Sequence, residues 1–465
     1  MILRTKIAVT IGPASADLDM VKKMINLGVS IFRINFSHGD WEEWKKYVDL
    51  IKDSSEALGR FVALIGDLPG ASIRLGKLSE KVYLKKDERV RIIYAEEAEG
   101  GNDMTLPIPL KPFFKHIQVG DILLLDDGRV QLQVEEVGKE EVSARALAHG
   151  EISSRKAVVV KGKELWLPIL SSRDIEAINF SILHDFDYLG LSYVRNKKDI
   201  EQLKSTIESL GGKDIGTMSK IETVEAVNNL TSIIDSSDAV LIARGDLGMH
   251  FGIEHIPRLQ EMISEKCLER GKPVVVATQL LGSIMNNPIP SRSEIIDVLT
   301  AIKDGVDVLM LTGETASGAY PLEAVEWLKK IVETYDPVIT PRKIGLSKNE
   351  DIRDRFAEGV TMLAESLGAS IVVYTKTGTT AKMISRNRPS VRLYACSSFI
   401  KVVRKMLIMW GVQPMKVYST EYLEGLEEMV NALKSSGEVK RGETIILTYG
   451  LRDEPIHLIK IVQIS

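Results

Sequence analysis

A lysine and two acidic residues follow two apolar segments of this chain. Lys220 and Glu222 stand at the end of the run 215–221, and Asp246 follows the run 239–243. Such runs are typical of buried parallel strands, whose carboxyl ends are where α/β sheets and barrels bind ligands. An ammonium group beside two carboxylates that can hold a hard divalent cation is suited to phosphate and enolate oxygens.

Glu222 and Asp246 form a candidate metal site. They are 24 residues apart, about one strand–helix unit, so we expect them on neighbouring strands. A buried acid is costly unless it is paired or bound to metal, and Mg²⁺ or Mn²⁺ suits an all-oxygen site with positions left for substrate. The alternative is that both acids only form salt bridges with Lys220 and Arg244.

Three roles are open for Lys220. It can form a Schiff base, as aldolases on a barrel fold do, or it can remain charged and stabilise an enolate or a transferring phosphoryl group. Nearby acids raise the pKa of a lysine, which favours the charged role. A structural counter-ion is the third interpretation.

Two further features near these strand ends can bind a carboxylate. Residues 245–248 predict a turn that opens a short helix, whose free N–H groups, including that of Gly245, can hold an anion. Thr278, at the end of the next expected strand, can complete the pocket with its hydroxyl. Neither feature is diagnostic alone.

The second expected strand ends in a polar cluster. Alternation sends Arg33, Asn35 and Ser37 to one side, and Asp67 from the third strand can join them. Arg33 suits a phosphate, and the neutral oxygens suit a weakly held monovalent cation. Asn35 and Ser37 can instead cap the following helix, and we interpret His38 as a polar rim residue.

Eight apolar runs alternate with amphipathic stretches of helical length. The expected strands are 6–11, 30–35, 61–67, 188–192, 216–221, 239–243, 273–278 and 306–311. This rhythm predicts an α/β fold built on a (β/α)8 TIM barrel, and a doubly wound open sheet is the alternative.

Two segments depart from that rhythm. Short β-like runs punctuated by turns, from about residue 77 to 162, predict a small all-β domain that can close over the site. After a linker at 336–351, a helical stripe and the strand 370–375 predict a separate α/β domain. We therefore expect a catalytic barrel (1–75 and 163–338), an inserted β-barrel lid domain (76–162) and a C-terminal α/β domain (339–465).

Bulk composition excludes several classes of protein. The 465 residues carry a net charge of −4 and no dense run of Lys or Arg, so the sequence shows no basic segment suited to binding nucleic acid. No apolar run is long enough for a membrane span or a signal peptide, so the cytoplasm is the expected location. The two cysteines, Cys267 and Cys396, support neither a disulfide framework nor a zinc site.

No Walker A or dinucleotide fingerprint occurs, so a nucleotide must be held by scattered contacts. One turn between a strand and a helix can bind phosphate, and it is formed by Thr375, Lys376, Thr377, Gly378, Thr379 and Thr380. It is either an effector site or an ordinary loop.

Six motifs occur in order along nearly the whole chain: Thr5-Lys6-Ile7…Thr10-Ile11-Gly12-Pro13-Ala14-Ser15, Arg33-Ile34-Asn35-Phe36-Ser37-His38-Gly39, Ser219-Lys220-Ile221-Glu222, Ala243-Arg244-Gly245-Asp246-Leu247-Gly248, Ala277-Thr278-Gln279 and Thr312-Gly313-Glu314-Thr315-Ala316. Together they resemble the pyruvate kinase family. The resemblance implies a glycolytic enzyme that transfers the phosphoryl group of phosphoenolpyruvate to ADP, giving ATP and pyruvate. Such a reaction needs mainly positioning and charge neutralisation.

The resemblance also implies roles for particular residues. Glu222 and Asp246 would hold Mg²⁺ or Mn²⁺, and Lys220 and Arg33 would stabilise the transferring phosphoryl group and the enolate. The Gly245 and Asp246 amides with Thr278 would bind the substrate carboxylate, and Thr278 matches the position linked to protonation of the enolate. The family's K⁺ site matches Asn35, Ser37, Asp67 and the Leu68 carbonyl, and its nucleotide contacts match Pro13, His38, Arg74 and Lys156.

Family members are usually homotetramers with an effector site in the C-terminal domain, which contains Thr375–Thr380. That domain would serve regulation and oligomerisation here.

Several residues depart from the family pattern. Ala71-Ser72 replaces the usual Pro followed by Lys or Glu, which leaves the K⁺ requirement open; we expect the ion to be needed because its other ligands remain. Gly282, His250 and the pair Lys156-Ala157 differ as well. Two other functions compete: an enolate-forming aldolase or lyase on the same barrel, and a metabolite sensor that has lost turnover.

Overall fold

Eight parallel strands close into a barrel in the computed structural model, which describes residues 3–98, 104–126, 128–163, 165, 167–339, 342–343, 351–450 and 457–465. The strands are β1 (Lys6–Thr10), β2 (Val29–Asn35), β3 (Ala63–Leu68), β14 (Tyr188–Leu191), β15 (Gly216–Ile221), β16 (Ala239–Ala243), β17 (Val274–Ala277) and β18 (Val308–Leu311). Their order, β1-β18-β17-β16-β15-β14-β3-β2, is closed. The predicted barrel is confirmed, and the open sheet is wrong.

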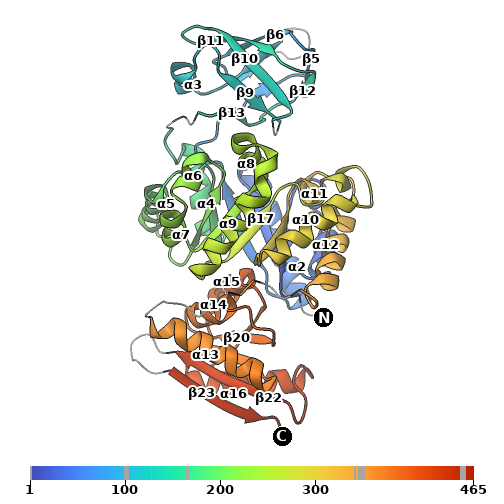
Figure 1. Ribbon diagram of the computed structural model, residues 1–465, viewed down its shortest axis with the longest axis vertical. Coiled ribbons are helices and arrows are strands. Elements are labelled where there is room, and N and C mark those ends of the chain that lie inside the picture. The colour runs from blue at the N-terminus through green and yellow to red at the C-terminus, as the bar shows by residue number, and fades with distance from the viewer. Residues whose placement is uncertain are drawn as a thin grey trace.

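Helices surround the barrel (Figure 1). They are α1 (Leu18–Asn26), α2 (Trp41–Leu58), α4 (Ser172–Leu183), α5 (Lys197–Ser209), α6 (Val224–Asn228), α7 (Leu230–Ser236), α8 (Arg244–Phe251), α9 (Ile256–Glu269), α10 (Arg292–Lys303), α11 (Gly313–Ala316) and α12 (Pro321–Tyr335), with short 3-10 turns η2 (Ile253–His255) and η3 (Gly282–Met285). Asp40, whose side chain accepts a bond from the Glu43 amide, caps α2. The alternative that Asn35 and Ser37 cap this helix is therefore wrong.

The segment between β3 and α4 folds as β-structure at one end of the barrel (Figure 1). Its strands are β4 (Lys77–Leu78), β5 (Val82–Leu84), β6 (Arg89–Ile93), β7 (Glu97–Ala98), β8 (Thr105–Pro107), β9 (Ile122–Leu125), β10 (Val130–Val137), β11 (Glu141–Ala146), β12 (Gly150–Ile152) and β13 (Val158–Val160), with one helix, α3 (Lys111–His116). Six of them form a sheet in the order β13-β9-β10-β11-β6-β8. The predicted all-β insert is confirmed, and below we call it the lid.

The C-terminal α/β unit lies at the opposite end (Figure 1). Its elements are α13 (Ile352–Leu367), β19 (Ser370–Tyr374), α14 (Thr379–Arg386), β20 (Leu393–Ser397), α15 (Ile400–Lys405), η4 (Met406–Ile408), β21 (Val412–Lys416), α16 (Tyr422–Ser435), β22 (Thr444–Gly450) and β23 (His457–Gln463). The sheet order is β21-β20-β19-β22-β23. In α13, where a helical stripe was expected, Val360 is buried and Leu367, the last residue of the helix, is 46% exposed. Most of the expected linker lies outside the described residues.

Leu407 and Ile408 of η4 pack into the interior of the barrel with residues such as Ala8, Ile31 and Met218. The C-terminal unit thereby closes the amino ends of the strands, and the carboxyl ends face the lid.

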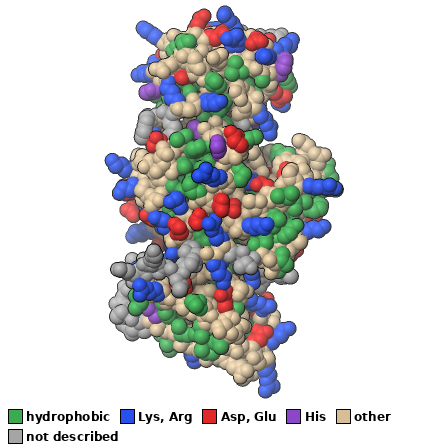
Figure 2. Space-filling model, in the orientation of Figure 1, with side chains coloured by type: hydrophobic (Ala, Val, Ile, Leu, Met, Phe, Trp, Pro, Cys, Tyr) green, Lys and Arg blue, Asp and Glu red, His purple; other side chains and the backbone are tan. Residues whose placement is uncertain are grey.

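Other sequence expectations concern the surface and the membrane. Acidic and basic side chains are interspersed on the face seen in Figure 2. Within the described part of the chain, no helix is long and apolar enough to cross a membrane. Cys267 and Cys396 are both buried free thiols.

Candidate active site

Lys220 lies at the carboxyl end of β15 among acceptors from three strands. Its Nζ is 2.8 Å from Glu222 Oε1, 3.3 Å from Asp67 Oδ1 and 2.6 Å from Ser192 Oγ. Burial lowers the pKa of Lys220, but the charges of Asp67 and Glu222 outweigh it, so that the pKa is raised. A permanently charged ammonium group is a poor Schiff-base nucleophile and a good partner for developing negative charge.

Arg33 reaches the same cluster from β2. Its Nε donates to Asp67 Oδ2 at 2.7 Å, and its NH1 donates to Thr10 Oγ1 at 2.9 Å. Asp67, which is buried, therefore lies between the two cations, and they keep its pKa low despite the burial that opposes this. Arg33 and Lys220 form a cationic pair held apart by one carboxylate.

Glu222 and Asp246 are joined by a residue that the sequence analysis did not single out. The Tyr193 amide donates to Glu222 Oε2 at 2.7 Å, and the Tyr193 hydroxyl donates to Asp246 Oδ1 at 3.2 Å. Glu222 is only 1% exposed. Of the alternative salt bridges, the one between Lys220 and Glu222 is present at 2.8 Å, whereas Arg244 pairs with Asp297 at 2.7 Å.

The carboxylates of Glu222 and Asp246 are the candidate ligands for a divalent metal. No group of three or more His, Cys, Asp or Glu side chains that could hold a metal lies among the described residues. Mg²⁺ is commonly bound by one or two carboxylates, with waters and substrate oxygens filling the other positions. The two carboxylates of Glu222 and Asp246, linked by Tyr193, fit that chemistry.

Thr278 sits on a strained turn after β17. Both Thr278 and Gln279 have positive φ, 69° and 54°. Arg244 holds this turn by donating through NH2 to the Thr278 and Gln279 carbonyls, each at 2.9 Å. The Thr278 hydroxyl accepts from the Gly245 amide at 3.0 Å, which joins it to the start of α8 as expected.

The four oxygen donors expected to bind a monovalent ion lie on β2, β3 and the turn after β2. Asn35 pairs with Asp67 in the β2–β3 register, and Asn35 Oδ1 accepts from the Ser37 amide at 3.1 Å. The Leu68 carbonyl accepts from Ser192 Oγ at 2.7 Å. Ser192, which also contacts Lys220, is a second residue that the sequence analysis did not identify.

A cavity of about 490 Å³ opens beside this cluster. It is lined by five of the expected site residues, Pro13, Arg33, Asn35, His38 and Thr278, together with residues of β1, α2 and α11. The other two expected nucleotide contacts are on the lid side: Arg74 donates to the Arg155 carbonyl, and Lys156 pairs with Asp126 at 2.6 Å.

The field at this cavity is positive. Burial, together with the charges of Arg74, Arg155, Arg33 and Arg173, lowers the pKa of His38 to about 4. His38 is therefore neutral at physiological pH, and the surrounding arginines suit a polyphosphate. Arg155 and Arg173 were not predicted, because only the fold brings them near residue 38.

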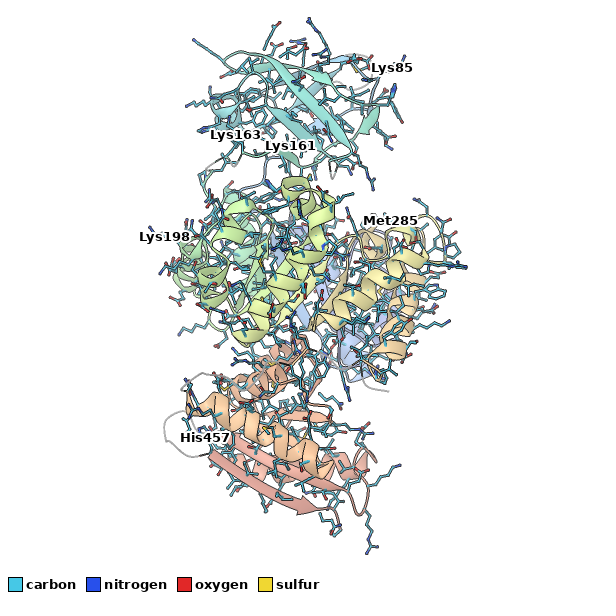
Figure 3. All side chains as sticks on the ribbon, viewed as in Figure 1. Lys85, Lys161, Lys163, Lys198, Met285 and His457 are labelled. Carbon is cyan, nitrogen blue, oxygen red and sulfur yellow. The ribbon has the colours of Figure 1, made fainter. Side chains whose placement is uncertain are left out.

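The Thr375–Thr380 turn borders a separate cavity of about 250 Å³ in the C-terminal unit. Arg353, Lys376 and His457 also line it, and Figure 3 labels His457 in this unit, far from the lid lysines Lys161 and Lys163. Gly378, with φ 84°, caps α14, and its amide donates to Thr375 Oγ1.

A barrel whose strand ends present a lysine, an arginine and two carboxylates defines an enzyme site for phosphate and enolate chemistry. Comparison with known families agrees. The family description "Pyruvate kinase, barrel domain" matches residues 2–325, and "Pyruvate kinase, alpha/beta domain" matches residues 354–462. The chain belongs to the pyruvate kinase family, whose enzymes transfer the phosphoryl group of phosphoenolpyruvate to ADP at the end of glycolysis.

Individual relatives match over nearly their full length. The chain is 35% identical to a pyruvate kinase of Aeropyrum pernix over 461 residues, which cover 98% of each chain. It is similar in structure to a pyruvate kinase of Pyrobaculum aerophilum, with a TM-score of 0.86 at 35% identity over 99% of each chain. A pyruvate kinase of Cryptosporidium parvum gives a TM-score of 0.88 at 30% identity, over 100% of this chain and 96% of that one.

Proposed function

We propose that Lys220, Arg33 and Thr278 are the catalytic residues of this enzyme. Lys220 and Arg33 bind the transferring phosphoryl group and stabilise the enolate left behind. The Gly245 and Asp246 amides and the Thr278 hydroxyl hold the substrate carboxylate, and Thr278 passes a proton to the enolate. The observation that carries the proposal is the charged Lys220, buried among Asp67, Glu222 and Ser192 at the carboxyl end of the barrel.

Glu222 and Asp246 are the proposed ligands for Mg²⁺ or Mn²⁺. When bound, the metal neutralises charge on the substrate oxygens. The chain itself supplies the two carboxylates, keeps Glu222 away from water and holds Lys220 protonated beside it.

Asn35, Ser37, Asp67 and the Leu68 carbonyl are the proposed ligands for K⁺. Ser72 supplies no cation that can replace the ion, which is why we propose that K⁺ is required. Full activity with tetramethylammonium as the only added monovalent cation would contradict this requirement.

We also propose that ADP and ATP bind in the cavity lined by Pro13 and His38, with Arg74 and Lys156 contacting the nucleotide from the lid. Lys156 must then leave Asp126, or share it, when the nucleotide enters. The four arginine charges that depress the pKa of His38 support a polyphosphate at this place.

The second cavity supports a regulatory role. We propose that Thr375, Thr377, Gly378, Thr379 and Thr380 bind the phosphate of an allosteric effector, since hydroxyls, a helix amino end and the cations Lys376 and Arg353 meet there.

Assembly and location are proposed as well. The edge strand β23 exposes Ile459 and Ile461, and the barrel exposes Ile253 and Ile296. These exposed apolar side chains are available for subunit contacts, and we propose a homotetramer. The division into a barrel (1–75 and 163–338), a lid (76–162) and a regulatory and oligomerisation domain (339–465) and a cytoplasmic location complete the proposal.

The test combines turnover with metal binding. We expect pyruvate formation from phosphoenolpyruvate and ADP with Mg²⁺ and K⁺, and Mn²⁺ binding without substrates, detected by electron paramagnetic resonance of the free ion. Glu222→Gln and Asp246→Asn should lose both turnover and Mn²⁺ binding, so that the signal of the free ion stays high. Glu254→Gln, which changes an exposed acid near the same helix, should keep both. Wild-type Mn²⁺ affinity in Glu222→Gln would overturn the metal site.

A further inference from the structure

Tyr193, which follows β14, contacts both proposed metal carboxylates through two different groups. Its backbone amide donates to Glu222 Oε2 at 2.7 Å, and its hydroxyl donates to Asp246 Oδ1 at 3.2 Å. The two acids come from consecutive strand ends, β15 and β16, and are bridged by one residue of a third strand. Tyr193 has a left-handed backbone, with φ 56°, a conformation that persists only where its surroundings fix it.

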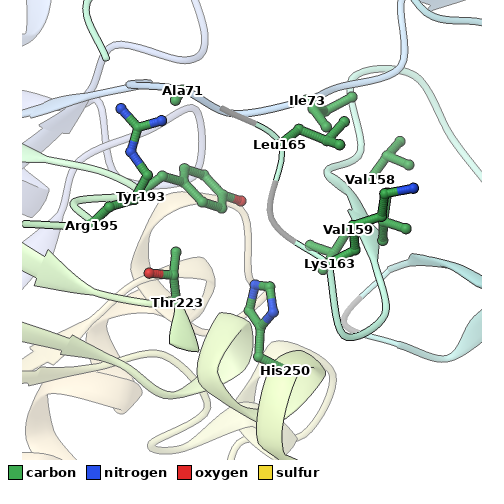
Figure 4. A pocket seen from close by; sticks show the side chains of 11 residues that line it. Ala71, Ile73, Val158, Val159, Lys163, Leu165, Tyr193, Arg195, Thr223 and His250 are labelled. Carbon is green, nitrogen blue, oxygen red and sulfur yellow. The ribbon is translucent and has the colours of Figure 1, made fainter. Parts of the chain in front are cut away.

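The ring of Tyr193 faces the base of the lid. It lines a small cavity with Ala71 and Ile73 from the chain entering the lid, and with Leu165 from the chain leaving it. His250 of α8 reaches the same cavity from below (Figure 4).

We propose that Tyr193 is a positioning residue that holds Glu222 and Asp246 at the spacing needed to bind the divalent metal. The inference rests on the proposed metal site and deepens it. A hydrogen bond to one oxygen of a carboxylate fixes the rotation of that group. Glu222 is held through both oxygens, by the Tyr193 amide at Oε2 and by Lys220 Nζ at Oε1. Because the amide contacts Glu222 and the hydroxyl contacts Asp246, Tyr193 links the positions of the two acids.

Tyr193→Phe separates the two contacts. It removes the hydroxyl while it keeps the ring in the lid cavity and the amide on Glu222. We expect Mn²⁺, titrated without substrates and followed by electron paramagnetic resonance, to bind about tenfold more weakly, the lower end of the loss typical for such outer-shell partners. In steady-state assays the KM for the metal should rise, and saturating metal should restore most of kcat.

Tyr188→Phe is the matched control. Tyr188 is a buried tyrosine on the same strand, and its hydroxyl donates to the Lys405 carbonyl at 3.0 Å, at the opposite end of the barrel. It should lose thermal stability and keep wild-type Mn²⁺ affinity. A general loss of packing would instead weaken metal binding in both variants, and that result would overturn the inference.

The outcomes also separate this inference from the metal site itself. If Glu222→Gln loses Mn²⁺ and Tyr193→Phe binds it as tightly as wild type, the site stands and the role of Tyr193 is wrong. If Glu222→Gln binds Mn²⁺ normally, the metal site is wrong and the inference fails with it.

Discussion

Charged side chains are buried at both ends of the barrel, and the two clusters differ in what completes their hydrogen bonds. At the carboxyl end, Lys220 and Arg33 meet Asp67 and Glu222 beside an open cavity. At the amino end, Asp307 is enclosed: Arg388 approaches both of its oxygens at 3.0 Å.

The amino-end cluster is closed by the C-terminal unit. The Trp410 amide donates to Asp307 Oδ1 and the Val274 amide to Oδ2. Arg388, only 2% exposed, also stacks over the Trp410 ring at 5.2 Å. Backbone amides and one arginine thus use the whole carboxylate, and none of its bonding capacity faces a cavity.

This difference separates a structural cluster from a functional one. Barrel proteins place catalysis at the carboxyl face, and conserved charge at the amino face contributes to stability. In both clusters, the removal of charged groups from water costs free energy. At the carboxyl end Arg33 lines a cavity of about 490 Å³, whereas both oxygens of Asp307 are taken up by protein donors.

The largest expected effect distinguishes two buried lysines, one at each end. Lys220→Met should lower kcat by about 10³-fold, the scale of losing a donor aimed at developing charge. Lys6→Met, at the amino end, should keep kcat, because Lys6 Nζ donates to the Val412 and Leu3 carbonyls, far from the site at the carboxyl ends of the strands. Pyruvate formation, normalised to folded protein by circular dichroism, measures both.

If kcat falls equally in Lys220→Met and Lys6→Met, the proposed difference between the two ends of the barrel is wrong. No turnover by folded wild-type protein, even with sugar phosphates and AMP added, would favour a metabolite sensor.

The next effect concerns stability. Asp307→Asn keeps the shape of the side chain but leaves Arg388 buried without its ionic partner, which should destabilise the fold by about 3–5 kcal/mol. Activity per folded molecule should stay unchanged. The first unfolding transition in guanidinium chloride gives the free energy.

The comparison for Asp307→Asn is an exposed ion pair. Asp49→Asn breaks the Lys45–Asp49 pair on the surface of α2 and should change stability by less than about 0.5 kcal/mol. Similar losses in both variants would mean that burial does not set the strength of the Asp307 pair.

The sequence predicted residues at strand ends well and residues brought in by distant packing poorly. Lys220, Glu222 and Asp246 follow apolar runs, so their place at one end of the barrel depends only on strand period and parallel order. The positions of the residues that contact these three side chains cannot be derived from strand period and order. Tyr193 binds Asp246, which lies 53 positions further along the chain. The residues beside Tyr193 in the sequence give no sign that its backbone is left-handed.

The same limit explains the amino end. Arg388 and Asp307 are 81 positions apart and belong to different units, so no local pattern connects them. The alternative that Asn35 and Ser37 cap α2 was wrong for a more local reason: Asn35 ends β2 and Ser37 lies in the turn after it, whereas Asp40 directly precedes the helix. The expected lid and C-terminal sheet were confirmed because their strand periods are local signals.

The smallest effect compares the two lysines by their titration. Burial lowers the pKa of Lys6 from 10.5 to about 8, against the opposing charges of Asp336 and Asp307, whereas the pKa of Lys220 is raised. Between pH 8 and 10.5 the unfolded chain keeps a proton on residue 6 that the folded chain has lost, so this site makes stability rise with pH. Relative to Lys6→Met, the free energy of unfolding of the wild type should increase by about 2 kcal/mol between about pH 7.5 and 9.5.

The contribution of Lys220 to the pH dependence has the opposite sign, since the folded chain keeps the proton on Lys220 to a higher pH than the unfolded chain does. Denaturant titrations of wild type and Lys6→Met at the two pH values measure the difference, and a difference that stays flat or falls would show that Lys6 is not the desolvated lysine that its burial indicates.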